Sequence, residues 1–205
     1  MLDQPDEISM PRLLRTVVWR NLNLPGMEYF SLSETKDGYL FDGILILSLQ
    51  DQPLRIQYQI TSDHAWQTQA VDVQALFGVA WHGMNIVVGE ELRWWVDGYE
   101  MSRLKGCVDI DLSFSPSTNT LPIRRLDLPV GAGQTVTAAW LRFPELEVQP
   151  LHQKYTRLEQ NLYRYESRNG SFAADIQVDD LGLVVVYPGG WERASFADGE
   201  IGGSN

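Results

Sequence analysis

Two aspartates in the stretch "DIDLSFSPSTNTLPIRRLDL", Asp109 and Asp111, have a spacing that could support hydrolysis. On a strand, residues two apart face the same side, and a rise of roughly 3.3 Å per residue places their Cα atoms about 6.6 Å apart. Inverting glycosidases hold their two catalytic carboxyl groups roughly 6.5–9.5 Å apart. The pair is therefore a candidate general acid and base acting on a glycosidic bond.

Two other interpretations of the same stretch remain open. The aspartates can lie on a solvent-facing strand edge, or they can form a polar network with Arg124 and Arg125, which follow the polar loop 115–120. Guanidinium and carboxylate groups pair bidentately, and such pairs would hold the loop rigidly. We favour the network, in which the loop presents residues 117–119 as hydrogen-bonding groups.

Aromatic residues are the second chemical feature of the chain. Most of the seven tryptophans are expected to pack in a core, because aromatic side chains bury large areas, while a minority could line a ligand cavity. They are Trp19, Trp66, Trp81, Trp94, Trp95, Trp140 and Trp191.

The segment "QKYTRLEQNLYRYE" is predicted to be one long strand, and its alternate residues place Tyr155, Arg157, Tyr163 and Tyr165 on one face. A face that mixes aromatic and cationic side chains suits a groove for an amphipathic ligand. An ordinary barrel exterior is the alternative for this face.

Other chemistry has little support in the sequence. The three histidines, His64, His82 and His152, are dispersed and form no metal-ligand spacing, so no metal is predicted. Cys107 precedes an acidic strand, an environment that raises the pKa of a thiol and disfavours a nucleophilic role. Nucleotide-binding and nucleophile-elbow motifs are absent, and no cofactor is predicted.

Composition and charge set the class of protein. The chain has 205 residues, 44% hydrophobic and 21% charged, as expected for a globular domain with a substantial core. A formal net charge of −11 disfavours nucleic acid and anionic lipid surfaces as partners. A single cysteine, an acidic N-terminus and the absence of a long apolar run predict a soluble cytoplasmic protein without transmembrane anchoring. The sequence makes no prediction of the oligomeric state.

Hydrophobic alternation predicts many strands and few helices. "LRIQYQI" is the clearest case, with Leu54, Ile56, Tyr58 and Ile60 on one side of a strand. "LLRTVVWR", "CVDIDLSF" and "FAADIQV" read similarly, and Asp97-Gly98 marks a tight hairpin. We therefore expect an all-β fold, in which a single curved antiparallel sheet forms a roll or a partly open barrel with few short helices.

The predicted domain organisation is simple. Residues 1–12 are expected to be a disordered extension, residues 13–194 a single β-roll domain, and residues 195–205 a flexible tail.

Several long motifs resemble a known family. They are "GCVDIDLSFSPSTNTLPIRRLDLPVG", "AAWLRFPELEVQPLHQKYTRL", "LYRYES", "VDDLGLVVVYPGGW", and, nearer the N-terminus, "VVWRNLNLPGMEYFSL" and "IQYQITSDHAWQTQAV". Together they resemble the bacterial putative glycolipid-binding proteins over about residues 14–193. The resemblance implies a spiral β-roll similar to the cradle-like fold of periplasmic lipoprotein carriers. It transfers no catalytic residue.

As motif positions, the resemblance implies a set of ligand-binding candidates: Asp109, Asp111, Asn119, Thr120, Arg124, Arg125, Tyr155, Arg157, Tyr163, Tyr165, Asp179, Tyr187 and Trp191.

The function expected from these observations is binding of an amphipathic ligand, a glycolipid or related lipid, on a concave sheet. Aromatic faces would hold its apolar part, and Arg124, Arg125 and Arg157 would engage a polar or anionic head group. A glycoside hydrolase that uses Asp109 and Asp111 is the alternative, and a non-catalytic protein-interaction scaffold is a third hypothesis.

Overall fold

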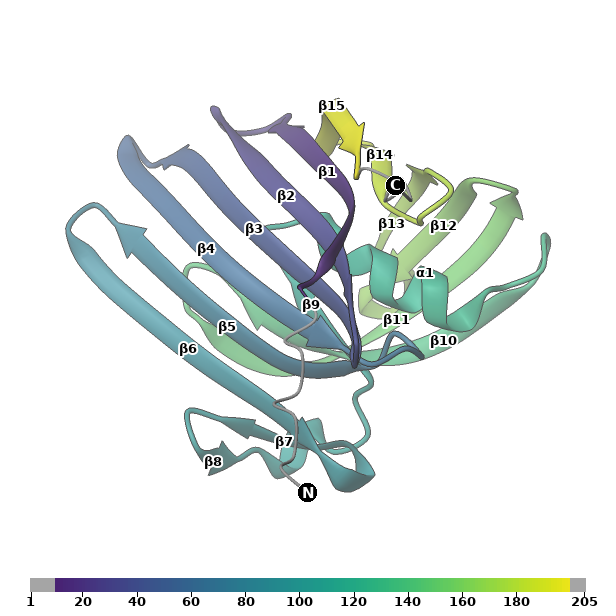
Figure 1. Cartoon of the computed structure of the whole chain (residues 1–205), viewed down its shortest axis with the longest axis horizontal. Helices are drawn as coiled ribbons and strands as arrows, with labels where there is room; N and C mark the ends of the chain where they lie inside the picture. The colour runs from purple at the N-terminus through teal and green to yellow at the C-terminus, as the bar shows by residue number, and fades with distance from the viewer. Residues whose placement is uncertain (1–9, 200–205) are drawn as a thin grey trace, which may run out of the picture.

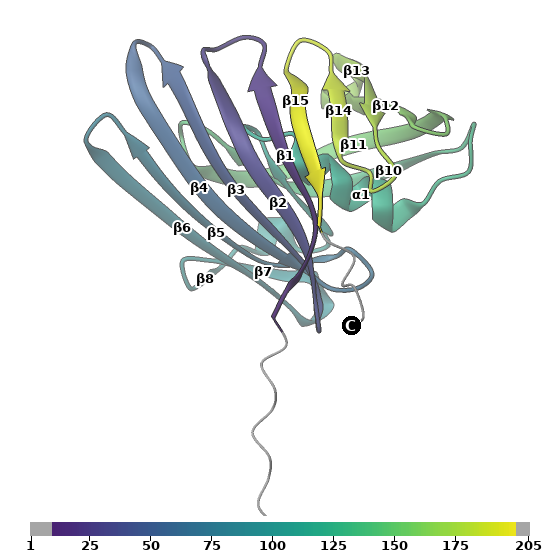
Figure 2. The ribbon, with the colours of Figure 1, turned by 45° about the horizontal axis from the view of Figure 1, so that its top comes forward.

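Within residues 10–199, fifteen strands form a single open sheet, which is antiparallel except for one parallel pair, β9 with β10. The computed structural model describes residues 10–199. The spatial order is β8-β7-β6-β5-β4-β3-β2-β1-β15-β14-β13-β12-β11-β10-β9, so nearly all neighbours in the sheet are also neighbours in sequence. Figures 1 and 2 show the sheet bent around the short helix α1 (Thr120–Leu126). The predicted all-β fold with an open, curved sheet is confirmed.

The strands before α1 are β1 (Arg12–Asn21), β2 (Gly26–Thr35), β3 (Gly38–Leu49), β4 (Gln52–Ser62), β5 (Thr68–Phe77), β6 (Ala80–Gly89), β7 (Arg93–Val96), β8 (Tyr99–Glu100) and β9 (Asp109–Leu112). Those after it are β10 (Gly133–Arg142), β11 (Glu147–Glu159), β12 (Leu162–Ser167), β13 (Phe172–Val178), β14 (Val184–Tyr187) and β15 (Trp191–Asp198). Four short 3-10 turns complete the elements, at Glu90–Leu92, Ser102–Leu104, Ser117–Asn119 and Arg168–Gly170.

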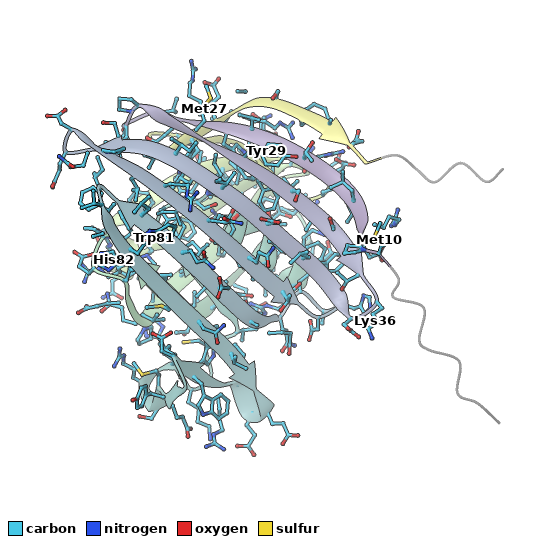
Figure 3. The ribbon with its side chains drawn as sticks, turned by 60° about the vertical axis from the view of Figure 1, so that its left-hand side comes forward. Met10, Met27, Tyr29, Lys36, Trp81 and His82 are labelled. Carbon is cyan, nitrogen blue, oxygen red and sulfur yellow. The ribbon has the colours of Figure 1, made fainter. Side chains whose placement is uncertain are left out.

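Alternating burial explains the long strands at the start of the sheet. In β4, Leu54, Ile56, Tyr58 and Ile60 are buried while Gln57 and Gln59 are exposed, as their spacing predicts. The same pattern recurs in β5 and β6, and the inward residues join one hydrophobic core. The outer face of this half is wetted, although Met27, Tyr29 and Trp81 lie exposed on it (Figure 3).

The predicted long strand "QKYTRLEQNLYRYE" is instead a hairpin. β11 ends at Glu159, the chain turns at Gln160 and Asn161, and β12 returns antiparallel. The prediction of one shared face still holds, because the register pairs Tyr155 with Tyr165 and Arg157 with Tyr163.

The sheet extends beyond the predicted domain limits at both ends. β1 begins at Arg12, and β15 continues to Asp198 in register with β1, so residues 195–198 are part of the sheet and not of a tail. Residues 1–9 of the predicted disordered extension 1–12, and residues 200–205 of the predicted tail, lie outside the described residues.

A charged network braces the place where β1 meets β15 and the turn after β13. Buried Arg15 donates to Asp179 at 2.8 Å and to Asp180 at 2.8 Å, and Arg193 donates to Asp179 at 2.6 Å. Hydrogen bonds in which both groups are ionised are among the strong ones. The network therefore fixes the bend that separates the β1–β6 half of the sheet from the β9–β14 half.

Candidate functional site

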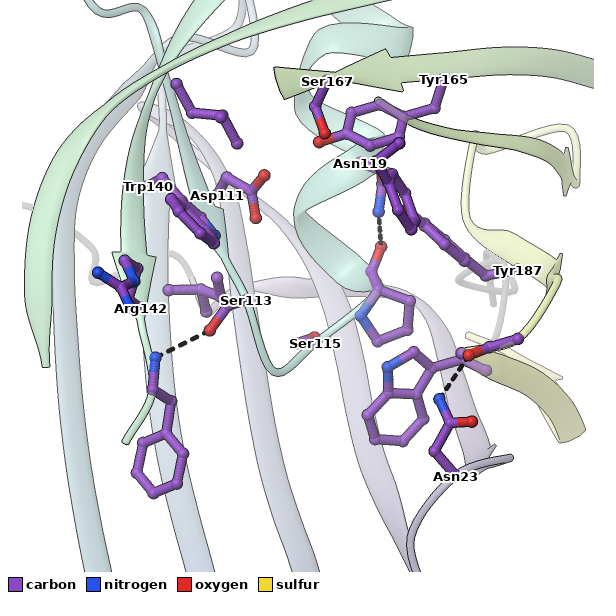
Figure 4. A pocket seen from close by; sticks show the side chains of 18 of the residues that line it. Asn23, Asp111, Ser113, Ser115, Asn119, Trp140, Arg142, Tyr165, Ser167 and Tyr187 are labelled. Atoms are coloured by element: carbon purple, nitrogen blue, oxygen red, sulfur yellow. Dashed lines mark hydrogen bonds between the residues drawn. The ribbon is translucent and has the colours of Figure 1, made fainter. Parts of the chain in front are cut away.

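A pocket of about 500 Å³ lies on the concave side of the β9–β14 half, within the size range of small-molecule sites. Its lining includes residues of β9 to β14 and of the segment 113–119, together with the end of β1, the start of β15 and the residues next to them. Figure 4 shows polar and aromatic side chains converging on this space. The lining includes Asn21, Asn23, Asp111, Ser113, Ser115, Asn119, Trp140, Arg142, Phe143, Glu145, Tyr165, Ser167, Arg168, Phe172, Tyr187 and Trp191.

Asp111 is one of two carboxylates that line this pocket, and Glu145 is the other. The parallel register of β9 and β10 places Asp111 beside Trp140, and its carboxylate accepts a hydrogen bond from Gln153 Nε2. Burial raises the pKa of Asp111 to about 6, and the hydrogen bond from Gln153 opposes that shift. Near pH 7 the group is mostly ionised, so it can accept hydrogen bonds from ligand hydroxyl groups.

Asn119 forms a rigid part of the same wall. Its Oδ1 accepts from the Tyr155 hydroxyl at 3.1 Å, and its Nδ2 donates to the Pro116 carbonyl at 3.0 Å. Because both ends of the amide are engaged, its orientation is fixed before any ligand arrives.

A row of aromatic rings runs from the interior to the pocket mouth. Buried Tyr155 packs on Tyr165 with centroids 5.2 Å apart, Tyr165 lies 6.4 Å from Tyr187, and Tyr187 stacks near Phe172 at 6.5 Å. Burial raises the pKa of both Tyr165 and Tyr187, so their hydroxyls stay protonated at neutral pH. The row gives the pocket flat apolar surfaces beside hydroxyl groups.

Asp109 and Asp111, the two aspartates of the predicted hydrolytic pair, bond to different partners. Asp109 is buried and pairs bidentately with Arg125, at 3.0 and 2.5 Å, whereas Asp111 bonds Gln153. Both line a narrow crevice that is too small to hold a water molecule, and only Asp111 lines the larger pocket. This arrangement favours the predicted network for Asp109 and gives a hydrolytic pair no shared substrate space.

Arg124 does not complete the network in the expected way. Its guanidinium lies 5.3 Å from the Trp66 ring centroid and donates to the Asp180 carbonyl, so it neutralises neither aspartate. The sequence places two arginines next to each other, but in a helix adjacent residues point in different directions. Only Arg125 reaches β9.

The predicted polar loop is also more buried than its composition suggests. Ser117 and Thr118 are 0% and 3% exposed, and Thr118 Oγ1 accepts from the Leu112 amide. Thr120 is the first residue of α1 and donates to the Gly182 carbonyl at 3.0 Å. Of the expected hydrogen-bonding loop residues, Asn119 therefore lines the pocket while Ser117 and Thr118 hold the loop in place.

A second, smaller pocket of about 210 Å³ collects four other candidates, Arg124, Arg157, Tyr163 and Asp179. Arg157 is held there by the Leu128 and Gln160 carbonyls and lies over Tyr163. Asp179 is bound to Arg15 and Arg193. The predicted set thus divides into three groups: Asp111, Asn119, Tyr165, Tyr187 and Trp191 line the larger pocket, these four line the smaller one, and Asp109, Thr120, Arg125 and Tyr155 line neither.

One buried polar cluster next to the larger pocket was missed by sequence reasoning. Glu28 on β2 accepts from the Tyr58 hydroxyl and from Ser115 Oγ at 2.7 Å, and Tyr58 also bonds Ser117 at 2.7 Å. Burial raises the pKa of Glu28 to about 8. Ser115 belongs both to this cluster and to the pocket wall, so the cluster ties β2 and β4 to the pocket.

Glycine at position 43 makes this cluster possible. A Cβ there would lie 2.3 Å from the ring of Tyr58, so only glycine lets that ring lie flat over β3. The signal for Glu28 was also present in the sequence, because it shares its strand face with Phe30 and Leu32.

No group of three or more histidine, cysteine, aspartate or glutamate side chains suited to a metal ion occurs within residues 10–199. In the same range, no helix is long and apolar enough to cross a membrane.

Fold and site together define a β-barrel-like protein with a polar and aromatic pocket on a concave sheet. The family model described as "Putative glycolipid-binding" matches residues 16–193, and the chain belongs to that family. The resemblance predicted from the motifs is confirmed.

Two solved structures are similar to this one. A crystal structure of a DUF1089 family protein from Pseudomonas aeruginosa has 30% sequence identity and a TM-score of 0.73, covering 81% of this chain and 91% of that one. A β-barrel-like protein of the domain of unknown function DUF1849 from Brucella abortus has 9% identity and a TM-score of 0.52, covering 93% and 98%, and supports the fold alone. A search of curated proteins found no match.

Proposed function

We propose that the protein binds the sugar head group of a glycolipid in the larger pocket. The observation that carries this proposal is the combination of inward-facing polar groups with aromatic faces in a pocket of about 500 Å³. Sugars present hydroxyl groups at their edges and apolar C–H surfaces on their faces, so they fit sites that pair carboxylate and amide groups with aromatic rings.

Asp111 and Asn119 have defined roles in this proposal. Asp111 accepts from sugar hydroxyls, and Asn119, fixed by Tyr155 and Pro116, offers its remaining amide hydrogen. Tyr187 and Trp191, which also line the pocket, supply ring faces. The polar lining suits a head group better than an acyl chain.

The apolar chain of the ligand would leave across the pocket mouth. Phe172 is 40% exposed there and continues the aromatic row through Tyr187. Such an edge can shelter part of an alkyl chain while its remainder stays outside.

We place this binding activity in the cytoplasm, because the only cysteine, Cys107, is free and buried.

Octyl β-glucoside, a neutral glycolipid mimic with one sugar and one chain, tests the proposal by isothermal titration. Tyr187→Ala and Asp111→Ala are each expected to weaken its binding by about tenfold, because each removes a contact worth roughly 1–2 kcal/mol. Tyr29→Ala is the matched control, since Tyr29 is half exposed on the outer face of β2.

Extraction of organic-soluble material from the purified protein is the complementary measurement. A stoichiometric glycolipid is the expected result. Absence of any bound amphiphile, together with no heat of binding for octyl β-glucoside, would overturn the proposal.

A further inference from the structure

Two arginines stand at the mouth of the larger pocket and flank the same ring. The guanidinium carbons of Arg142 and Arg168 lie 5.4 and 5.3 Å from the centroid of Trp140. Cation–π contacts of this kind hold a guanidinium in place while leaving its N–H donors free. All three side chains line the pocket.

The charge partners of the two arginines differ. Arg142 donates to Glu145 at 3.2 Å, so that pair is close to neutral. Among residues 10–199, Arg168 has no carboxylate within ion-pair distance, and the same holds for Arg55, Arg103 and Arg124, which do not line this pocket. The other arginines each have an ion-pair partner: Arg12, Arg15, Arg20, Arg93, Arg125, Arg157, Arg164 and Arg193. In a chain of net charge −11, an uncompensated guanidinium at a pocket mouth is a local exception to the overall electrostatics.

The backbone that carries Arg168 is unfavourable for an arginine. Arg168, Asn169 and Gly170 have φ values of 52°, 56° and 82°, so a non-glycine residue with a long side chain occupies the left-handed region in this turn between β12 and β13. That conformation favours glycine, and asparagine tolerates it. Strained residues of this kind gather where a side chain has a task.

The carboxylate of Asp111 and the guanidinium of Arg168 lie at different places in the pocket. Asp111 lies on β9 beside Trp140 and is hydrogen-bonded to Gln153, whereas Arg168 approaches the ring from the β12–β13 turn. A ligand that satisfies both has hydroxyl groups for the carboxylate and an anionic group for the guanidinium. Arginine recognises carboxylate and phosphate groups through parallel N–H donors.

We propose that the ligand is an acidic glycolipid, whose sugar carries a carboxylate or phosphate group bound by Arg168. This inference rests on the proposed glycolipid function and adds the charge of the head group.

The test compares three probes that differ in one feature each. Octyl β-glucoside is neutral, octyl β-glucuronide has the same ring and chain with a carboxylate, and free glucuronate has the carboxylate without the chain. Titration of the intact protein is expected to give about tenfold tighter binding of octyl β-glucuronide than of octyl β-glucoside, as for one charge-assisted hydrogen-bonding group.

Two glycine substitutions in one turn distinguish the effect of the Arg168 side chain on binding from the effect of the backbone conformation. Arg168→Gly removes the guanidinium and also relieves the left-handed backbone, so the variant is expected to fold with an unchanged or higher Tm while the preference for octyl β-glucuronide falls below about twofold. Asn169→Gly also places glycine at a left-handed position of this turn, with a smaller backbone gain and without removing a pocket residue, and it is expected to keep the tenfold preference.

The outcomes distinguish this inference from the proposed function. Equal binding of the neutral and anionic glycosides, or a preference that survives in Arg168→Gly, overturns the acidic head group and leaves glycolipid binding intact. Failure of both glycosides to bind overturns both proposals. Free glucuronate binding as tightly as octyl β-glucuronide keeps the anion site and rejects a lipid as its source.

Discussion

The two halves of the sheet present different chemistry to the interior. Strands β2–β6 turn an almost continuous apolar face inward, with Phe41, Ile56 and Val73 among the buried side chains. Strands β9–β13 turn inward Asp111, Gln153 and Ser167 together with tyrosines. We call β2–β6 the apolar half, because it supplies most of the hydrophobic core. We call β9–β13 the pocket half, because it supplies most of the pocket.

The difference shows how one sheet can both fold and bind. A fully apolar interior would leave no directed polar groups for a ligand, and a fully polar one would bury too little apolar surface to offset the entropy of folding. Placing the inward-facing polar groups of the pocket on β9–β13 keeps their desolvation cost local. There each carboxylate has a partner, Arg125 for Asp109 and Gln153 for Asp111.

The largest expected effect is in the apolar half. Phe41 is fully buried and packs edge-on against Phe30 at 5.8 Å. Phe41→Ala should lower the free energy of unfolding by about 3–5 kcal/mol, the range for phenylalanine truncation in a core, measured by urea denaturation. Ile46→Ala, on the exposed face of the same strand, is the control and should cost less than about 1 kcal/mol. A loss below 1 kcal/mol for Phe41→Ala would mean that this half is not the main core.

A smaller effect is expected where the pocket half buries a charge. Arg125→Met leaves Asp109 buried without its cation, so the free energy of unfolding should fall by about 2–3 kcal/mol, somewhat less than for a fully buried pair because Arg125 is partly exposed. The loss should shrink in the double variant Arg125→Met with Asp109→Asn, since the uncompensated charge is gone.

Arg124→Met is the control for that helix. Its side chain is exposed and contacts Trp66, so the cost should stay within about 1 kcal/mol. Equal losses for the two neighbouring arginines would show that the ion pair with Asp109 does not stabilise the pocket half.

Sequence patterns predicted the apolar half better than the pocket half. The alternation in "LRIQYQI" is local, and it correctly gave both the strand and its buried face. The pocket depends on pairings between distant segments, such as the parallel pairing that sets Asp111 beside Trp140, and no local pattern encodes them.

Individual residues show the same limit. The letters "RNG" at 168–170 are typical of a tight turn, but the direction of the Arg168 side chain over Trp140 depends on left-handed backbone angles that these letters do not specify. The adjacent arginines suggested a shared role, yet α1 sends Arg125 to Asp109 and Arg124 to Trp66. Glu28 was missed because a single acidic residue between Met27 and Tyr29 looks solvent-facing until Phe30 and Leu32 define its face.

The subtlest prediction concerns Glu28, a fully buried acidic group on the inner face of the apolar half. Because its pKa in the folded protein is raised to about 8, above the ordinary value near 4.5, the folded state holds a proton that the unfolded state releases in that window. Stability contributed by the neutral acid is thus full below about pH 4.5 and declines as the pH rises towards 8. The expected slope is about −1 kcal/mol per pH unit between pH 5 and 7, to which Asp111 adds only below about pH 6.

Glu28→Gln isolates this contribution, since glutamine keeps the shape and an acceptor for Tyr58 and Ser115 but does not titrate. Urea unfolding at pH 6.2 and 7.5 should show the wild-type protein losing about 1–2 kcal/mol relative to the variant. Parallel pH profiles for the two proteins would mean that Glu28 is already ionised in the fold. The apolar half would then tolerate a buried charge, and its contrast with the pocket half would be weaker than the inward-facing residues suggest.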